Sequence, residues 1–227
     1  MENNFLKGLE LIDSLKPSDD IETIKKTLIE AYKMSDRLLD AITLLSRFID
    51  NFYQKEKILT DAIKQEYSYL LNEGSLPLDD GMMARQFIRA LYELSNLYKD
   101  FEKYPLLIKV YEAINDLKSG YPYGINHDLY ALYTYFDKDE RHNFESIKTS
   151  DKLLIDCIYE YERSNYELAK KYRDELVSFC PNIIEILDGN DEIVDEDVSN
   201  MLRRYAFYIN RITSIIEFIK TGVCRWI

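Results

Sequence analysis

The sequence predicts an all-α protein built from stacked antiparallel helical hairpins, and three observations support this prediction. Apolar residues recur every three or four positions over most of the chain, which is the period of amphipathic helices. The 227 residues include only 7 Gly and 5 Pro, too few for the closely spaced turns of a sheet-rich fold. Hydrophobic residues make up 46 % of the chain, which is enough for a sizeable core.

The N-terminal third of the chain is expected to form a helical bundle. Pro17 ends a first amphipathic helix, and the acids after it cap a second, because Asp19 and Glu22 have capping-box spacing. The predicted helices cover residues 4–15, 21–31, 35–52 and 55–72. The segment GSLPLDDG, residues 74–81, combines two Gly, a Pro and two Asp and is the best candidate linker. We therefore predict an N-terminal segment 1–74 and a second segment 79–227, or one continuous domain.

Three further helices are expected before residue 140. The first presents Met83, Phe87, Leu91, Leu94 and Tyr98 on one face. Pro105 suits the first turn of the next helix, where no amide partner is needed, and SGYPYG at residues 119–124 ends it. Asn126 can cap the third, short helix. A charged connector leads from there to a hairpin at residues 150–182.

The hairpin at 150–182 has the clearest local pattern. Its first helix aligns apolar residues at helical spacing, and Ser164-Asn165 interrupts the run before the second helix begins. Pro181 then disfavours helix in the residue before it. The inward positions are Leu153, Leu154, Cys157, Ile158, Tyr161, Leu168, Ala169, Tyr172, Leu176 and Phe179.

These residues resemble a tetratricopeptide repeat, a helix-turn-helix unit of about 34 residues. Leu153 takes the bulky early position, Cys157 and Ala169 take small positions, and Tyr166 opens the second helix. A looser copy from Ile88 to Ser119 has the same register. The match is degenerate: Leu153 replaces Trp, and the large aromatic Tyr172 lies one position early. A solenoid of such repeats and an ordinary closed helical bundle both remain open.

The C-terminal part combines an acidic loop with a wide apolar stripe. The loop DGNDEIVDED covers residues 188–197. The stripe that follows repeats every seven residues over 198–219, so we predict one long helix with a face that must be buried. This helix either caps the hairpins, as terminal repeats require, or forms a homodimer; we favour the cap.

Motifs for catalysis or for cofactor binding are not found. The sequence lacks GxSxG, HExxH and Gly-rich phosphate loops, so we expect no enzyme activity, no cofactor and no metal. The acidic loop offers Asp188, Asn190, Glu192 and Asp195 as oxygen ligands, but the Gly and Glu of an EF-hand are replaced by Ile193 and Ser199. A pair formed by His127 and His142, beside acids such as Asp128, is the remaining idea for a metal or acid-base site.

Charge and composition limit the partners. The net charge of −12 argues against direct binding of nucleic acid. No apolar run approaches the length of a membrane span, and no signal-peptide pattern opens the sequence, so we expect a cytoplasmic protein without a membrane partner. The three cysteines match neither a disulfide framework nor a zinc pattern.

The function expected from these features is binding of a protein or peptide in a Tyr-lined groove, since 19 residues are Tyr. The resemblance to tetratricopeptide proteins implies a concave surface formed by the first helix of each hairpin. On that analogy the ligand-facing residues are Tyr92, Asn96, Lys99, Tyr159, Glu160, Glu162 and Arg163. The alternative is an acidic inhibitor, of the kind made by phages or mobile elements, that mimics nucleic acid in a basic cleft.

Overall fold

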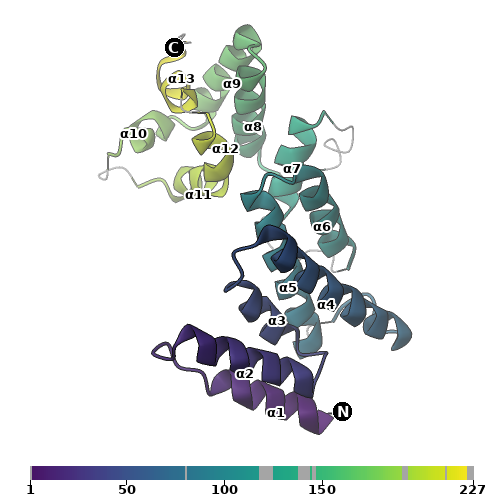
Figure 1. Cartoon of the computed structure of the whole chain (residues 1–227). Helices are drawn as coiled ribbons and strands as arrows, with labels where there is room; N and C mark the ends of the chain where they lie inside the picture. Colours follow the sequence, from purple (N-terminus) through teal and green to yellow (C-terminus); the bar gives the residue numbers. More distant parts are fainter. Residues whose placement is uncertain are drawn as a thin grey trace. The chain divides into compact units, whose positions relative to one another are not determined.

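The computed structural model describes residues 2–79, 81–117, 125–137, 144, 147–190, 194–212 and 214–223. Over these residues the chain forms thirteen helices and no strand, which confirms the predicted all-α class (Figure 1). The chain divides into two compact units, Met1–Tyr121 and Pro122–Ile227. This boundary differs from the predicted one at 74–79. The segment 74–81 is indeed a connection, but it joins two helices within unit 1.

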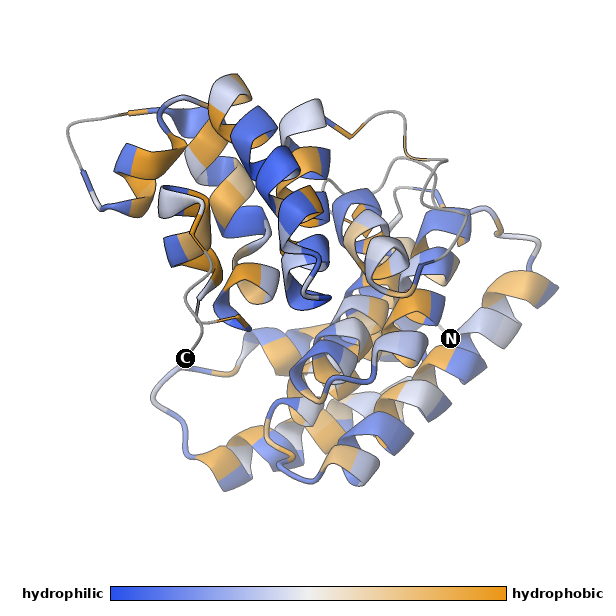
Figure 2. Cartoon of the chain, turned by 90° about the horizontal axis from the view of Figure 1, so that it is seen from above, coloured by the Kyte–Doolittle hydropathy of each residue, from blue (hydrophilic) through white to orange (hydrophobic). Residues whose placement is uncertain are grey.

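Unit 1 is a series of helices in which each packs against the next in sequence. Its helices are α1 (Glu2–Asp13), α2 (Ile21–Met34), α3 (Leu39–Ser46), α4 (Phe52–Asn72), α5 (Met82–Asp100) and α6 (Tyr104–Leu117). In addition, α3 packs against α5. Figure 2 shows individual helices with hydrophobic and hydrophilic residues on different faces, as the sequence period requires.

The first two helices pack closely because Gly8 faces the second helix. A Cβ atom at Gly8 would lie 2.8 Å from a methyl carbon of Leu38 and 3.1 Å from the carbonyl oxygen of Ala31. Ala31 and Leu38 are fully buried, and apolar residues of α1 pack against them. The cap of α2 is Asp20, whose side chain accepts a hydrogen bond from the amide of Thr23. The acid that caps the helix is thus Asp20, in place of the capping box predicted from Asp19 and Glu22.

The predicted helix over 35–52 is shorter in the structure. α3 covers only Leu39–Ser46, and a turn separates it from α4. Asn51 ends this turn, because its side chain accepts a hydrogen bond from the amide of Gln54 and caps α4. The apolar spacing continues across the turn because both helices bury one face. Such spacing alone does not distinguish one helix from two.

The α5–α6 hairpin buries the apolar positions of the looser repeat copy that begins at Ile88. Each inward position expected there is at most 6 % exposed. These positions are Leu91, Leu94, Ser95, Tyr98, Tyr104, Leu107, Tyr111 and Ile114. A helical hairpin is thus present, and its assignment to a repeat family stays a prediction.

Unit 2 is organised around the second hairpin, α8 (Thr149–Glu162) and α9 (Tyr166–Phe179), which pack against each other along their length. α7 (Ile125–Tyr135) packs against α8. Leu154, Cys157, Ala169 and Leu176 are fully buried, as the pattern predicted. Leu168 and Tyr172 are only half-buried, and Phe179, which was also expected to point inward, is 63 % exposed. The predicted end of α6 at 119–124 lies outside the described residues.

The C-terminal stripe does not form the single long helix that the sequence predicted. It forms α11 (Glu196–Arg204), α12 (Ala206–Asn210) and α13 (Ile215–Thr221), while α10 (Ile183–Leu187) precedes the acidic loop. The stripe is nevertheless buried within unit 2: Val198, Met201, Tyr205, Tyr208, Ile215 and Ile219 are at most 7 % exposed. This burial removes the reason for placing a homodimer on residues 198–219.

Among the described helices, none combines the length and the apolar character that a membrane span requires.

Candidate functional site

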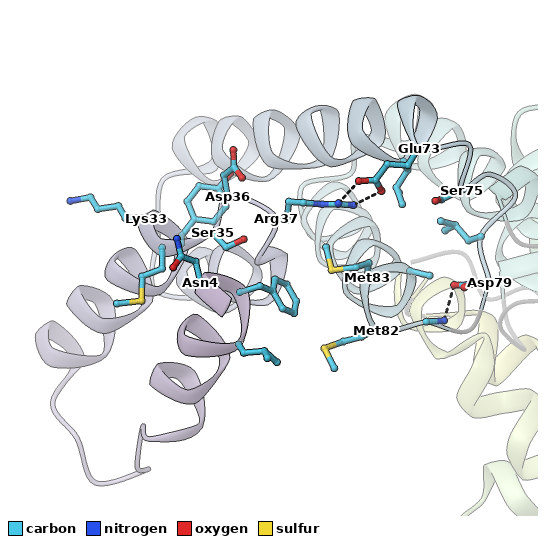
Figure 3. Close-up of a pocket in the computed structure, with 18 residues that line it drawn as sticks. Asn4, Lys33, Ser35, Asp36, Arg37, Glu73, Ser75, Asp79, Met82 and Met83 are labelled. Carbon is cyan, nitrogen blue, oxygen red and sulfur yellow. Dashed lines mark hydrogen bonds and ion pairs between the residues drawn. The ribbon is translucent and has the colours of Figure 1, made fainter. Parts of the chain in front are cut away.

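A groove of about 890 Å³ opens in unit 1. One wall comes from the start of α1 and the end of α2, and the other from the end of α4, the following connection and the start of α5 (Figure 3). The lining residues are Asn4, Phe5, Leu6, Tyr32, Lys33, Met34, Ser35, Asp36, Arg37, Leu70, Glu73, Ser75, Leu78, Asp79, Gly81, Met82, Met83 and Ala84.

Methionine and leucine side chains give the groove its apolar surface. Met82 and Met83 extend from the start of α5 toward the wall formed by α1 and α2 (Figure 3). Met82 and Leu6, on opposite walls, are each 51 % exposed, and Met34 is 36 % exposed. Unbranched methionine adapts its shape to different partners, so it is common at binding surfaces that accept varied apolar groups.

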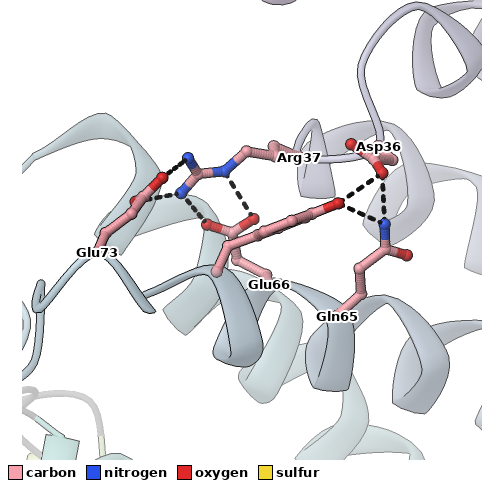
Figure 4. A network of polar contacts seen from close by, with 6 residues as sticks. Asp36, Arg37, Gln65, Glu66 and Glu73 are labelled. Atoms are coloured by element: carbon pink, nitrogen blue, oxygen red, sulfur yellow. Dashed lines mark hydrogen bonds and ion pairs between the residues drawn. The ribbon is translucent and has the colours of Figure 1, made fainter. Parts of the chain in front are cut away.

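An arginine held by two glutamates forms the polar edge of the groove. The Arg37 guanidinium donates to both carboxylate oxygens of Glu66, at 2.8 and 3.2 Å, and also to Glu73 (Figure 4). The Glu66 side chain is fully buried, whereas the Glu73 side chain is 47 % exposed. Burial raises the pKa of Glu66, and the bonds from Arg37 oppose that rise.

A second set of contacts fixes the loop between α2 and α3. The Asp36 carboxylate accepts hydrogen bonds from the Gln65 amide and, at 3.0 Å, from the Tyr69 hydroxyl. The Arg37 guanidinium lies over the Tyr69 ring, 5.3 Å from its centroid. Consecutive residues of this loop are therefore tied to α4, which holds one edge of the groove in place.

The charges around the groove are mainly acidic. The lining holds three carboxylates, on Asp36, Glu73 and Asp79, and two cations, on Lys33 and Arg37. Arg37 is shared between Glu73 and the buried Glu66 behind it. Lys33 extends away from the methionines (Figure 3). The start of α5 has no side-chain cap, and Asp79 lies beside it, accepting the Gly81 amide at 2.8 Å. The carboxylate thus offsets the partial positive charge of this helix end.

The seven residues predicted to face a ligand do not line this groove. Tyr92, Asn96 and Lys99 lie on α5 in unit 1, and the other four lie at the end of α8 in unit 2. Asn96, Glu162 and Arg163 are exposed, and Glu160 is half-buried. Tyr159 was expected to be exposed but is only 7 % exposed, with the Arg163 guanidinium 4.7 Å from its ring centroid. Its ring is therefore not available to a ligand.

The histidine hypothesis leads to a buried network in unit 2. His142 lies outside the described residues. The Nε2 atom of His127 lies 3.8 Å from an Asp151 carboxylate oxygen that also accepts from Arg204. Asp151 is 1 % exposed, and the Tyr205 ring beside His127 is fully buried. Burial raises the pKa of Tyr205 and lowers the pKa of His127.

This network joins helices and does not offer an open reaction site. It links α7, α8 and α11, and the carboxylate at its centre is shielded from solvent. The two cysteines described, Cys157 and Cys180, are buried, and burial raises the pKa of the Cys157 thiol to about 12. This thiol therefore lacks the thiolate character that a nucleophile needs at neutral pH.

The acidic loop uses its carboxylates within unit 2. Asp188 pairs with Lys220 at 2.7 Å, and Asp197 pairs with Lys148 at 2.8 Å. Asp195 caps α11 by accepting the Val198 amide. Glu192 of the calcium hypothesis lies outside the described residues, and the part of the chain that is described holds no cluster of three or more His, Cys, Asp or Glu suited to a metal.

Comparisons with protein-family models, with curated proteins and with solved structures give no match to this chain. The groove itself was missed by the sequence interpretation. Two signals were present: the Met82-Met83 pair directly after a polar linker, and Met34 at the end of an amphipathic helix.

Proposed function

We propose that this protein is a non-enzymatic binding module that holds a peptide segment of another protein in the groove of unit 1. The observation that carries the proposal is the groove itself, with the half-exposed side chains of Met82 and Leu6 on its opposite walls. A volume of about 890 Å³ is sufficient for several side chains of a partner. Apolar surface of this kind on a folded unit is typical of interaction sites.

The α5–α6 hairpin supplies part of one wall of the groove through the start of α5. We interpret α5–α6 and α8–α9 as repeat-like units, and the burial of equivalent positions in both supports this interpretation. The buried free thiols of Cys157 and Cys180 fit the cytoplasmic location that we propose.

The test is selection of binders from a library of random peptides displayed on phage, using the full chain as bait. Peptides rich in apolar residues should be enriched. Met82→Gln and Leu6→Gln, one on each wall, should each weaken the binding of the selected peptides by about tenfold. Each substitution removes apolar contact area without adding charge. Isothermal calorimetry gives the dissociation constants.

The matched control is Tyr53→Gln, which removes an apolar side chain that is 75 % exposed in the same unit but outside the groove. It should leave binding unchanged. NMR of labelled methionine methyl groups adds an internal control, since Met34, Met82 and Met83 should shift on binding and Met201, buried in unit 2, should not. Selected peptides that bind all three variants equally, or a library without binders, would overturn the proposal.

A further inference from the structure

The buried network of unit 2 brings two basic side chains to one carboxylate. The Arg204 guanidinium, from α11, donates a hydrogen bond to an Asp151 oxygen, and the Nε2 atom of His127, from α7, lies 3.8 Å from the same oxygen. We propose that His127 is an acid-sensitive switch for α11: its protonated imidazole replaces Arg204 as the partner of Asp151, which shifts α11 toward release from α7 and α8. This inference concerns unit 2 and does not depend on the groove of unit 1.

The neutral imidazole suits the closed arrangement better than the imidazolium does. The Nδ1 atom of His127 is buried and has no hydrogen-bond partner among the described residues. Both nitrogen atoms of a protonated ring carry hydrogen, so Nδ1 would become a buried charged donor without an acceptor, which is costly. The charge of Arg204, held at the same Asp151 oxygen, also repels a second cation.

The other groups around the ring do not remove this conflict. Burial is the largest influence on the pKa of His127 and lowers it; the carboxylates raise it and the cations lower it further. The Tyr205 ring at the end of α11 has its centroid 6.3 Å from that of the imidazole. The charged groups are Asp128 on α7, Asp151 on α8, Lys148 before α8 and Arg204 on α11, and the Tyr208 hydroxyl of α12 donates to Asp128 at 3.5 Å.

The attachments of α11 make it the element that opens. α7 and α9 both pack against α8, whereas the close backbone contacts of the nine-residue α11 are mainly with α12, which follows it. A second ion pair, Lys148 with Asp197, joins the start of α8 to α11, but both side chains are largely exposed, so this pair contributes little. When Arg204 leaves, Asp151 keeps a partner, because protonated His127 remains beside it.

The experiment is hydrogen exchange of the full chain at about pH 7.5 and about pH 5.5, read by mass spectrometry and corrected for the slower chemical exchange of amides in acid. Amides of 196–210 should open up to about tenfold more often in acid, which is the limit for one proton over about one pH unit below 6.5. Amides of α8 should change less. In His127→Gln, whose side chain stays neutral, the acid effect on 196–210 should disappear.

Two further variants make the test specific. His142→Gln is the matched control, because the chain has only two histidines, and it should behave as the wild type does. Arg204→Gln removes the neighbouring cation and leaves Asp151 to His127, so the NMR titration midpoint of this imidazole should rise by about one pH unit. The comparison of α11 with α8 in the wild type needs no variant, so it stands even where a substitution prevents folding.

The outcomes decide the proposal in either direction. Acid opening of 196–210 that is lost in His127→Gln but kept in His142→Gln supports the switch. An acid effect of equal size in His127→Gln and the wild type, or in α8 and α11, would overturn it. A His127 midpoint that Arg204→Gln leaves unchanged would also overturn it, because the two side chains would then not compete for Asp151.

Discussion

At the scale of single residues, the burial of the Glu66 carboxylate depends on its ion pair with Arg37. This carboxylate is fully buried, and both oxygens accept hydrogen bonds from Arg37. A buried carboxylate without a compensating cation is costly, because burial disfavours the charged form. The second partner of Arg37, Glu73, is half-exposed and can be hydrated when it is alone.

We therefore expect very different effects from removing the two partners of this network. Arg37→Ala should lower the free energy of unfolding by about 3 kcal/mol or more, because it leaves Glu66 uncompensated. Glu73→Ala should lower it by less than about 1 kcal/mol, because the pair that it breaks is solvated. Urea unfolding followed by circular dichroism measures both values. Equal losses in the two variants would show that Glu66 does not depend on Arg37.

His127 should make unit 2 less stable in mild acid. Burial is the main cause that lowers its pKa below 6.5; Arg204 and Lys148 lower it further, while Asp151 and Asp128 oppose the shift. Below pH 6.5 the unfolded chain takes up the proton while the folded chain does not. The stability contributed by neutral His127 is thus present above 6.5 and is lost as the pH falls toward its lowered pKa.

The check is urea unfolding of the wild type and of His127→Gln between about pH 7.5 and about pH 5, a range in which histidine titrates and most carboxylates do not. The wild type should lose stability over this range more steeply than the variant. An NMR titration midpoint of the His127 imidazole at or above 6.5 would contradict the argument.

At the scale of elements, the short helix α13 is held by an arginine from the hairpin. The Arg173 guanidinium donates to the carbonyl oxygens of Ile219 and Lys220, each at 2.7 Å. These carbonyls lie in the last turn of α13, where no intrahelical partner is available. Gly222, with φ of 67°, ends the helix and donates its amide to Phe218 at 2.8 Å.

Arg173→Met should therefore loosen α13 in particular. Two charge-assisted hydrogen bonds are lost, so we expect a decrease in unfolding free energy of about 1.5–3 kcal/mol. Hydrogen exchange of the amides of 215–222 should accelerate more than that of α8. Arg163→Met on the exposed end of the same hairpin is the control. Similar acceleration of exchange in both variants would show that Arg173 does not hold α13 in particular.

The C-terminal segment shows why element boundaries were harder to predict than burial. The seven-residue spacing identified most of the buried residues of the stripe, and the structure confirms their burial except at Ile212, which is half-buried. The spacing did not show where the helix breaks. Asn210 and the β-branched residues at 209, 212, 215 and 216 have low helix propensity. Three short helices can enclose these side chains within unit 2, whereas a straight helix presents a single flat stripe.

At the scale of the whole molecule, local patterns predicted the class and both hairpins but not the division into units or the groove. The linker composition at 74–81 is that of any loop, and contacts between distant segments decide which loop separates units. The groove combines residues from three segments, around Leu6, Arg37 and Met82. Each is ordinary in its own segment, so only the packing of α1, α2, α4 and α5 reveals that they meet.

The methionines of the groove also set its sensitivity to oxidants. Oxidation adds an oxygen atom to the thioether and turns a flexible apolar side chain into a polar one, a change that methionine sulfoxide reductases reverse. Met82 and Met34 are exposed to the extent of 51 % and 36 %, whereas Met201 in the core of unit 2 is 2 % exposed. We therefore expect peroxide to oxidise Met82 and Met34 before Met201, so that the groove loses apolar surface while the core of unit 2 is still intact.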